Sequence, residues 1–153
     1  MSASNTPRAD RGMPWPQMLA LAFGAVYLLI GIVGFFITGF DNFFGNENGM
    51  PAHHEGETLL GFMINPAHNV VHILIGAAGL ALSRTLAGAR TYGWLLAVGY
   101  GAAFIYGLFA VGKDWDFLNL NGADNVLHIL TALVGLVIAL APVRDHVDNR
   151  RTV

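Results

Sequence analysis

Four long apolar stretches alternate with short polar connections along this chain. Each stretch lacks Asp, Glu, Lys and Arg for about twenty residues: roughly Gln17 to Gly39, Ala67 to Ser83, Thr91 to Gly112 and Asn125 to Val143. A helix rises about 1.5 Å per residue, so these stretches approach or exceed a hydrocarbon core of about 30 Å. The pattern predicts an all-α membrane protein, a bundle of four transmembrane helices at about residues 16–39, 66–86, 91–112 and 122–143.

The two ends of the chain are polar. Residues 1–14 and 144–153 lack apolar periodicity, and we expect them to be short tails that flank a transmembrane domain over residues 15–143. The first apolar run follows Arg8 and Arg11 but exceeds the roughly 7 to 15 apolar residues of a secretory signal. We therefore expect it to be a membrane helix.

The basic residues predict the orientation. Lys113 is the only basic residue on one side of the predicted membrane domain. The other side carries seven arginines: Arg8, Arg11, Arg84, Arg90, Arg144, Arg150 and Arg151. Because basic segments stay in the cytoplasm, both termini are expected to be cytoplasmic, in a multi-pass protein of a bacterial inner membrane.

Composition agrees with this class and excludes others. Hydrophobic residues make up 54% of the 153 residues and charged residues 12%, against about a quarter charged in soluble domains. The absence of cysteine excludes disulfides and thiolate metal sites. We find no nucleophile with a plausible base, no phosphate-binding loop and no nucleic-acid patch, so we expect a protein that is not an enzyme and binds no nucleic acid.

One polar segment occurs twice. Asn65-Pro-Ala-His-Asn-Val-Val-His-Ile-Leu aligns with Asn121-Gly-Ala-Asp-Asn-Val-Leu-His-Ile-Leu at an offset of 56 residues, whereas the turns at Gly39 and Gly112 align at 73. The offset of 56 pairs Asn65 with Asn121, His68 with Asp124, Asn69 with Asn125 and His72 with His128. The sequence therefore predicts two parallel two-helix repeats related by a pseudo-twofold axis along the membrane normal, with helices two and four equivalent.

These polar residues have a structural interpretation. Asn65 before Pro66 is a strong helix start, and Asn121 before Gly122 resembles it. Asp124 would then serve the free amides of its helix start, while the histidines and asparagines would hydrogen-bond across helices two and four. This interpretation explains every residue type, but ionisable groups inside a membrane are costly and are usually functional.

Two ligand-binding hypotheses use the same residues. His68, His72, Asp124 and His128 lie at i, i+4 spacing on two helices, and three imidazoles with one carboxylate suit tetrahedral Zn²⁺ or another divalent ion. Alternatively, His72 and His128 ligate a haem b for electron transfer. Small residues below them would leave room for the macrocycle: Gly76, Gly79 and Ala132.

Other features carry less weight. Few polar groups could form a path, so transport of ions or small molecules is a weaker hypothesis. His53, His54, Glu55 and Glu57 cluster in the first outer loop, where a solvated loop explains them better than a metal or pH-sensing site. Gly99, Ala103 and Gly107 recur every four residues on helix three, which favours close packing within the bundle or between copies.

The chain also resembles a family of small bacterial four-helix integral membrane proteins classed as a domain of unknown function. The matching segments are Gly56-Glu-Thr-Leu-Leu-Gly-Phe, Asn65-Pro-Ala-His-Asn-Val-Val-His and Leu120-Asn-Gly-Ala-Asp-Asn-Val-Leu-His. The resemblance spans helix one to helix four and implies no activity, substrate or cofactor. We therefore expect a noncatalytic structural or accessory protein of the lipid bilayer that self-associates or joins a larger membrane complex, with Zn²⁺ or haem binding as the alternative.

Overall fold

The computed structural model describes residues 12–44, 57–140 and 142–143. They form four helices, α1 (Trp15–Thr38), α2 (Pro66–Leu82), α3 (Leu86–Ala110) and α4 (Gly122–Leu140), and a hairpin of β1 (Thr58–Leu59) and β2 (Phe62–Met63). The predicted helical class is confirmed. Helices α1, α3 and α4 are long and apolar enough to cross a membrane, whereas α2 is shorter, at 17 residues.

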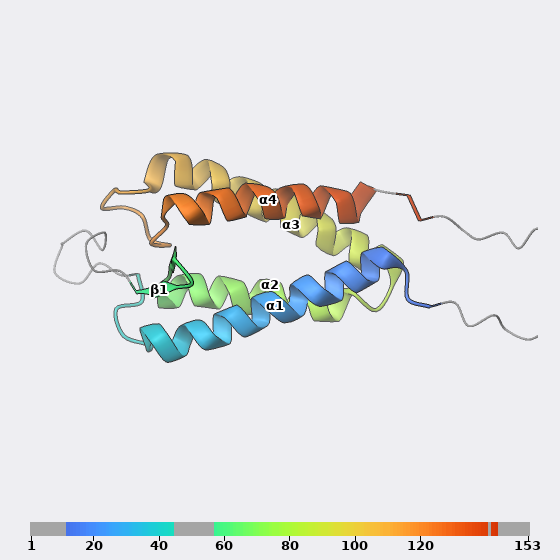
Figure 1. Cartoon of the computed structure of the whole chain (residues 1–153), viewed down its shortest axis with the longest axis horizontal. Helices are drawn as coiled ribbons and strands as arrows, with labels where there is room; N and C mark the ends of the chain where they lie inside the picture. Colours follow the sequence, from blue (N-terminus) through green and yellow to red (C-terminus); the bar gives the residue numbers. More distant parts are fainter. Residues whose placement is uncertain (1–11, 45–56, 141, 144–153) are drawn as a thin grey trace, which may run out of the picture.

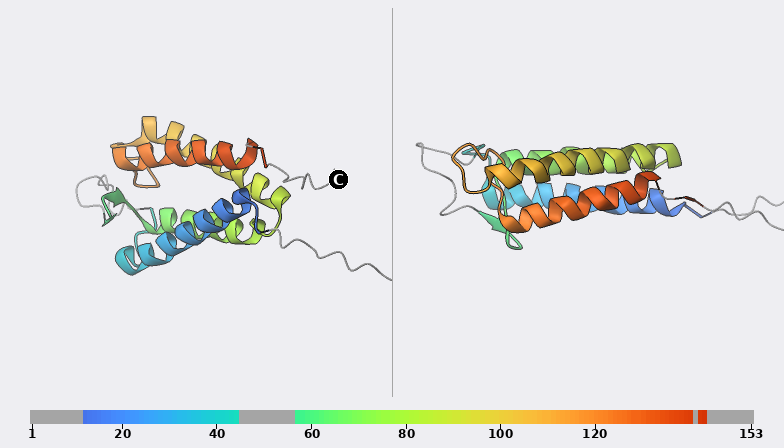
Figure 2. Two further views of the ribbon diagram at one scale, coloured as in Figure 1. Left: turned by 45° about the vertical axis from the view of Figure 1, so that its right-hand side comes forward. Right: turned by 90° about the horizontal axis from the view of Figure 1, so that it is seen from above.

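The helices pack as two pairs. Helix α1 lies mainly against α2, and α3 lies mainly against α4. Figure 1 shows that the pairs converge at the end where α1 begins and diverge toward the end that holds the hairpin. The left view in Figure 2 shows the same divergence. We call the latter the hairpin end; it also holds the connection between α3 and α4, residues 111–121.

The start of α3 and the end of α2 differ from the expected positions because of local capping. Helix α3 begins at Leu86 rather than near residue 91, since the side chain of Thr85 accepts a hydrogen bond of 3.0 Å from the amide of Gly88. Helix α2 ends at Leu82, where the amide of Ser83 donates to the carbonyl of Gly79. A short turn between Leu82 and Leu86 therefore joins the two helix pairs. Helix α4 ends at Leu140 rather than at residue 143.

The hairpin was not predicted from the sequence. Thr58 pairs with Met63, and Leu59 pairs with Phe62. The two residues of its turn, Leu60 and Gly61, have φ of 55° and 89°. Two consecutive residues with positive φ are typical of the tight turns that join antiparallel strands. The usual Asn-Gly signal is missing, because a leucine occupies the first turn position.

Close backbone contact within each helix pair depends on glycine. A methyl group at Gly24 of α1 would lie 2.7 Å from the backbone nitrogen of Leu80 in α2. A methyl group at Gly93 of α3 would lie 2.7 Å from the backbone nitrogen of Ala139 in α4. Larger residues at these positions would push the paired helices apart.

The predicted stripe of small residues on α3 does not act as one packing surface in the chain. A side chain at Gly99 would meet nothing within 4 Å, whereas Gly107 is buried against the side chain of Asn125. Ala103 is half-buried between them. Successive positions four apart rotate slowly around the helix, so one end of the stripe faces α4 and the other faces outward.

Candidate functional site

The sequence-predicted polar residues gather at the hairpin end, beginning with two matched helix starts. The side-chain oxygen of Asn65 accepts a hydrogen bond of 2.8 Å from the amide of His68. The side-chain oxygen of Asn121 accepts one of 3.0 Å from the amide of Asp124. Both asparagines therefore satisfy a free amide in the first helical turn.

The same two asparagines tie the halves of the molecule together. The amide nitrogen of Asn65 donates to the backbone carbonyl of Phe117 over 2.8 Å. The amide nitrogen of Asn121 donates to the carbonyl of Gly61 over 2.9 Å. The offset of 56 residues that pairs Asn65 with Asn121 also pairs Gly61 with Phe117. Each helix start is therefore fixed to the segment that precedes the other.

The carboxylate of Asp124 completes these connections. One of its oxygens accepts hydrogen bonds of 2.9 Å from the amide of Asn121 and 3.2 Å from the amide of Met63. The first bond closes the start of α4, and the second joins α4 to β2. Asp124 is 2% exposed, so these amides replace the water that would otherwise solvate its charge.

Asn69 and Asn125 occupy equivalent places one turn further in. Each side chain occupies space left by a glycine of the neighbouring helix. Asn69 lies against Gly34 of α1, and Asn125 lies against Gly107 of α3. The side-chain amide nitrogen of Asn69 donates to the hydroxyl of Thr38 over 2.9 Å. The expectation that Asn69 hydrogen-bonds across helices two and four was wrong, because its partner belongs to α1.

Three imidazoles lie between the helix pairs. The ring centroids of His68 and His72 are 4.5 Å apart, and those of His68 and His128 are 6.1 Å apart. Their exposed fractions are 3%, 7% and 3% for His68, His72 and His128. The Nδ1 atom of each ring is buried without a hydrogen-bond partner. Hydrogen bonds therefore explain Asn65, Asn121 and Asp124, but not these nitrogens, nor the side-chain oxygens of Asn69 and Asn125, which are also buried without a partner.

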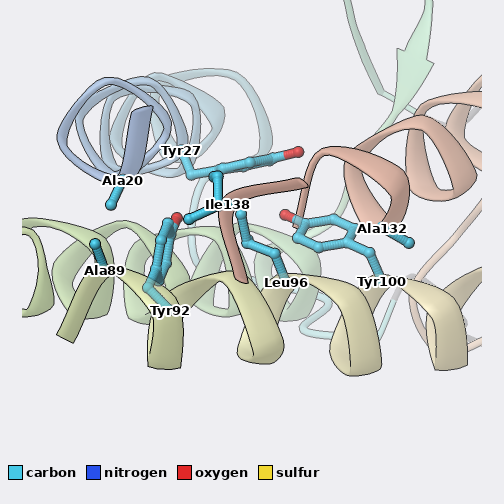
Figure 3. Close-up of a cluster of buried hydrophobic side chains, with 8 residues drawn as sticks. All are labelled: Ala20, Tyr27, Ala89, Tyr92, Leu96, Tyr100, Ala132 and Ile138. Atoms are coloured by element: carbon cyan, nitrogen blue, oxygen red, sulfur yellow. The ribbon is translucent and has the colours of Figure 1, made fainter. Parts of the chain in front are cut away.

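Two tyrosines enclose the imidazoles on the side away from the hairpin end. The ring centroid of Tyr27 lies 5.3 Å from that of His72, and the centroid of Tyr100 lies 5.4 Å from that of His128. The two tyrosine rings are 5.2 Å apart and turn their hydroxyl groups toward each other (Figure 3). The hydroxyl of Tyr27 shares a hydrogen bond of 2.8 Å with that of Thr131.

A further carboxylate, which sequence reasoning missed, holds the connection between α3 and α4. One oxygen of Asp116 accepts from the amide of Leu118 and the hydroxyl of Tyr106, both over 3.2 Å. The other accepts from the amide of Leu120 over 2.8 Å. The carbonyl of Phe117 in this loop accepts the hydrogen bond from Asn65, so Asp116 supports the connection between the halves.

A family model for a domain of unknown function, DUF4383, matches residues 17–141, from the start of α1 to just past the end of α4. The chain belongs to the DUF4383 family. The resemblance to a domain of unknown function is thus confirmed. Comparison with curated proteins and with solved structures gives no match. The polar connections and the imidazole cluster all lie inside the matched DUF4383 segment.

The four expected metal ligands of this DUF4383 chain do not form one group. His68, His72 and His128 lie together, but Asp124 directs an oxygen to backbone amides. Within residues 12–44, 57–140 and 142–143, no three His, Asp or Glu side chains are arranged around a metal position. A metal site here would therefore exclude Asp124 and would require the imidazole rings to reorient.

Two of the three small residues expected to leave room for a haem lie against neighbouring helices in this DUF4383 domain. A side chain at Gly76 would meet the backbone of Leu28, and one at Gly79 would meet Gly24 and the ring of Tyr92. These glycines therefore face α1 and α3 rather than an opening for a macrocycle. The predicted loop cluster of His53, His54 and Glu55 lies outside the described residues, and Glu57 precedes β1.

Proposed function

We propose that this member of the DUF4383 family is a noncatalytic integral membrane protein, with four membrane-spanning helices and a structural or accessory role. In this role it associates with a second copy of itself or with a larger membrane complex. The observation that carries the proposal is the distribution of apolar side chains, which cover the outside of a bundle whose interior holds polar ones.

Exposed apolar side chains support a lipid environment. Phe36 of α1 is 86% exposed, Leu74 of α2 is 64% exposed, and Val98 and Phe109 of α3 are each 67% exposed. Large apolar surfaces of this kind are rare on soluble monomers and suit hydrocarbon chains. The polar hairpin-end connections would be buried from lipid, as backbone and side-chain polar groups in a membrane must be.

Repeated contacts support two parallel repeats. Tyr27 packs on His72 at 5.3 Å, and Tyr100, its partner at an offset of 73, packs on His128 at 5.4 Å. The same offsets relate the contact of Gly34 with Asn69 to that of Gly107 with Asn125. Arg84 and Arg90 lie at the end of the helices opposite the hairpin, and the other arginines precede α1 or follow α4 in the sequence, so the positive-inside rule favours cytoplasmic termini.

The exposed face of α3 supports association. Leu95, Val98, Ile105 and Phe109 are each at least 52% exposed and follow a helical spacing along this face. Gly99 lies beside them, and a side chain at this position would meet no other described atom of the protein within 4 Å. Small residues on a membrane helix allow another helix to approach closely, because van der Waals packing replaces the hydrophobic effect there.

Single-cysteine crosslinking tests the proposal, because the chain has no cysteine of its own. We expect Gly99→Cys to form disulfide-linked dimers when oxidised in native membranes. Leu74→Cys is the matched control, exposed on α2, and should remain monomeric. Absence of any Gly99→Cys product, or equal crosslinking of both variants, would contradict association through α3. Extraction of the protein from membranes by alkaline carbonate would contradict the integral-membrane assignment itself.

A further inference from the structure

Three imidazoles are clustered at the hairpin end, and they are the metal-ligating side chains there whose ring nitrogens lack partners among the described residues. Their Nδ1 atoms are buried without partners, as are the side-chain oxygens of Asn69 and Asn125 and the hydroxyl of Tyr100. A buried polar group without a partner costs free energy, so three in one cluster require a reason. An interhelical lock would supply hydrogen bonds to these nitrogens, and the cluster provides none.

His68 shows how such a ring is held. Its imidazole is hydrogen-bonded to the backbone of Met63 and of Leu118. Since Nδ1 has no partner, those contacts belong to Nε2, which leaves the lone pair of Nδ1 available to a ligand. Metal-bound histidines in proteins commonly donate their other ring nitrogen to a backbone carbonyl or a carboxylate in this way.

The ring spacing also suits coordination. Two imidazoles bound to one tetrahedral ion at about 2.0 to 2.1 Å hold their centroids roughly 5 Å apart. The separations here are 4.5 Å for His68 and His72 and 6.1 Å for His68 and His128, on either side of that value. The rings do not surround one metal position, so coordination requires rotation about the bond to the imidazole, a torsion with broad minima.

We propose that His68, His72 and His128 bind one divalent transition-metal ion through their Nδ1 atoms, with Zn²⁺ as the best match for three neutral imidazoles. Asp124 is not a ligand in this site, because its oxygen holds the amides of Asn121 and Met63. Three protein ligands leave one position of a tetrahedral ion for water.

This site does not depend on self-association, so it is tested separately. The full-length protein, without a histidine tag, is purified in mild detergent, stripped with a chelator, and titrated with Zn²⁺ against a competing indicator. We expect about one ion per chain, a raised melting temperature, and visible absorption typical of tetrahedral coordination when Co²⁺ replaces Zn²⁺. His128→Asn should weaken binding by about 100-fold or more, because even changes around the ligands cost about 10- to 100-fold.

Two control variants define the site. Asp124→Asn should leave Zn²⁺ affinity within a few fold, which separates the three-histidine site from one that includes the carboxylate. The double variant His53→Ala with His54→Ala should also bind normally, which excludes the loop. Loss of metal in either control would overturn the proposal, as would stoichiometric Zn²⁺ retained by His128→Asn.

X-ray absorption at the zinc edge of the unsubstituted protein gives a second test that needs no variant. The expected shell contains about three imidazole nitrogens at about 2.0 to 2.1 Å. A shell of oxygen atoms alone would overturn the proposal even if the histidine variants fail to fold. If the stripped protein binds no ion, the Nδ1 atoms are satisfied by buried water and the proposal is wrong.

Discussion

The side-chain amide of Asn65 donates a 2.8 Å hydrogen bond to the backbone carbonyl of Phe117, which ties the start of α2 to the connection between α3 and α4. The same side chain caps α2 through the amide of His68. One residue therefore fixes a helix start and joins the two helix pairs at the end where they diverge.

Replacement of Asn65 by alanine should destabilise the protein more than loss of an ordinary helix cap. The cap alone is worth about 0.5 to 2 kcal/mol, and the change also leaves the carbonyl of Phe117 without its partner. Thermal unfolding in detergent, followed by tryptophan fluorescence, would measure this. Asn65→Asp keeps the acceptor and loses the donor, so its melting temperature should lie between those of Asn65→Ala and the unsubstituted protein.

Glycine substitutions on α3 should separate internal packing from the outer face. Gly107→Ala would place a methyl group against the side chain of Asn125, whereas the methyl group of Gly99→Ala would meet nothing within 4 Å. Overpacking of this kind costs about 1 to 3 kcal/mol, so we expect a lower melting temperature for Gly107→Ala only. Equal behaviour of the two variants would show that Asn125 moves aside without cost.

The hydrogen bond between Tyr27 and Thr131 should couple α1 to α4. Tyr27→Phe and Thr131→Val each remove one partner of this buried 2.8 Å contact. Such bonds in membrane proteins average about 0.6 kcal/mol in double-mutant cycles. The doubly substituted protein should therefore be less destabilised than the sum of the single variants. Strict additivity of the unfolding free energies would mean that the hydroxyls do not interact.

Much of the fold follows from local sequence signals. Asn65 before Pro66 marks the start of α2 because the side chain caps free amides and proline suits the first turn, and α2 begins there. The end of α2 was predicted near residue 86 rather than at Leu82, since a long side chain such as Arg84 can extend from the end of a membrane helix to the interface. The hairpin was missed because Leu60 occupies a turn position with positive φ that sequence patterns reserve for glycine or asparagine.

The site was only partly predictable for a different reason. The repeat identified His72 and His128 as equivalent, and the three histidines do lie together. Spacing along one helix cannot show which polar atom a neighbouring segment will supply, so the amide of Met63 at Asp124 and the hydroxyl of Thr38 at Asn69 were not foreseen. The offset of 73 that pairs Tyr27 with Tyr100 was a signal that could have identified these two residues.

The proposed orientation predicts which ends of the helices face the cytoplasm. Because the chain lacks cysteine, a single introduced thiol reports its own side. Asp114→Cys lies in the exposed connection at the hairpin end, and Ala87→Cys lies exposed at the opposite end, near the turn between α2 and α3. A membrane-impermeant maleimide should label Asp114→Cys in intact cells, and Ala87→Cys only after the membrane is opened. The reverse pattern would invert the topology.

Asp124 should matter for folding through the two amides that it accepts. Asp124→Ala would leave the amides of Asn121 and Met63 buried without their partner, at a cost of about 1 to 3 kcal/mol each. Asp124→Asn retains one oxygen acceptor but loses the stronger bonds of a charged group and its favourable position at a helix start. We therefore expect melting temperatures to fall slightly for Asp124→Asn and strongly for Asp124→Ala. A fully stable Asp124→Ala protein would mean that the hairpin and the start of α4 do not depend on this carboxylate.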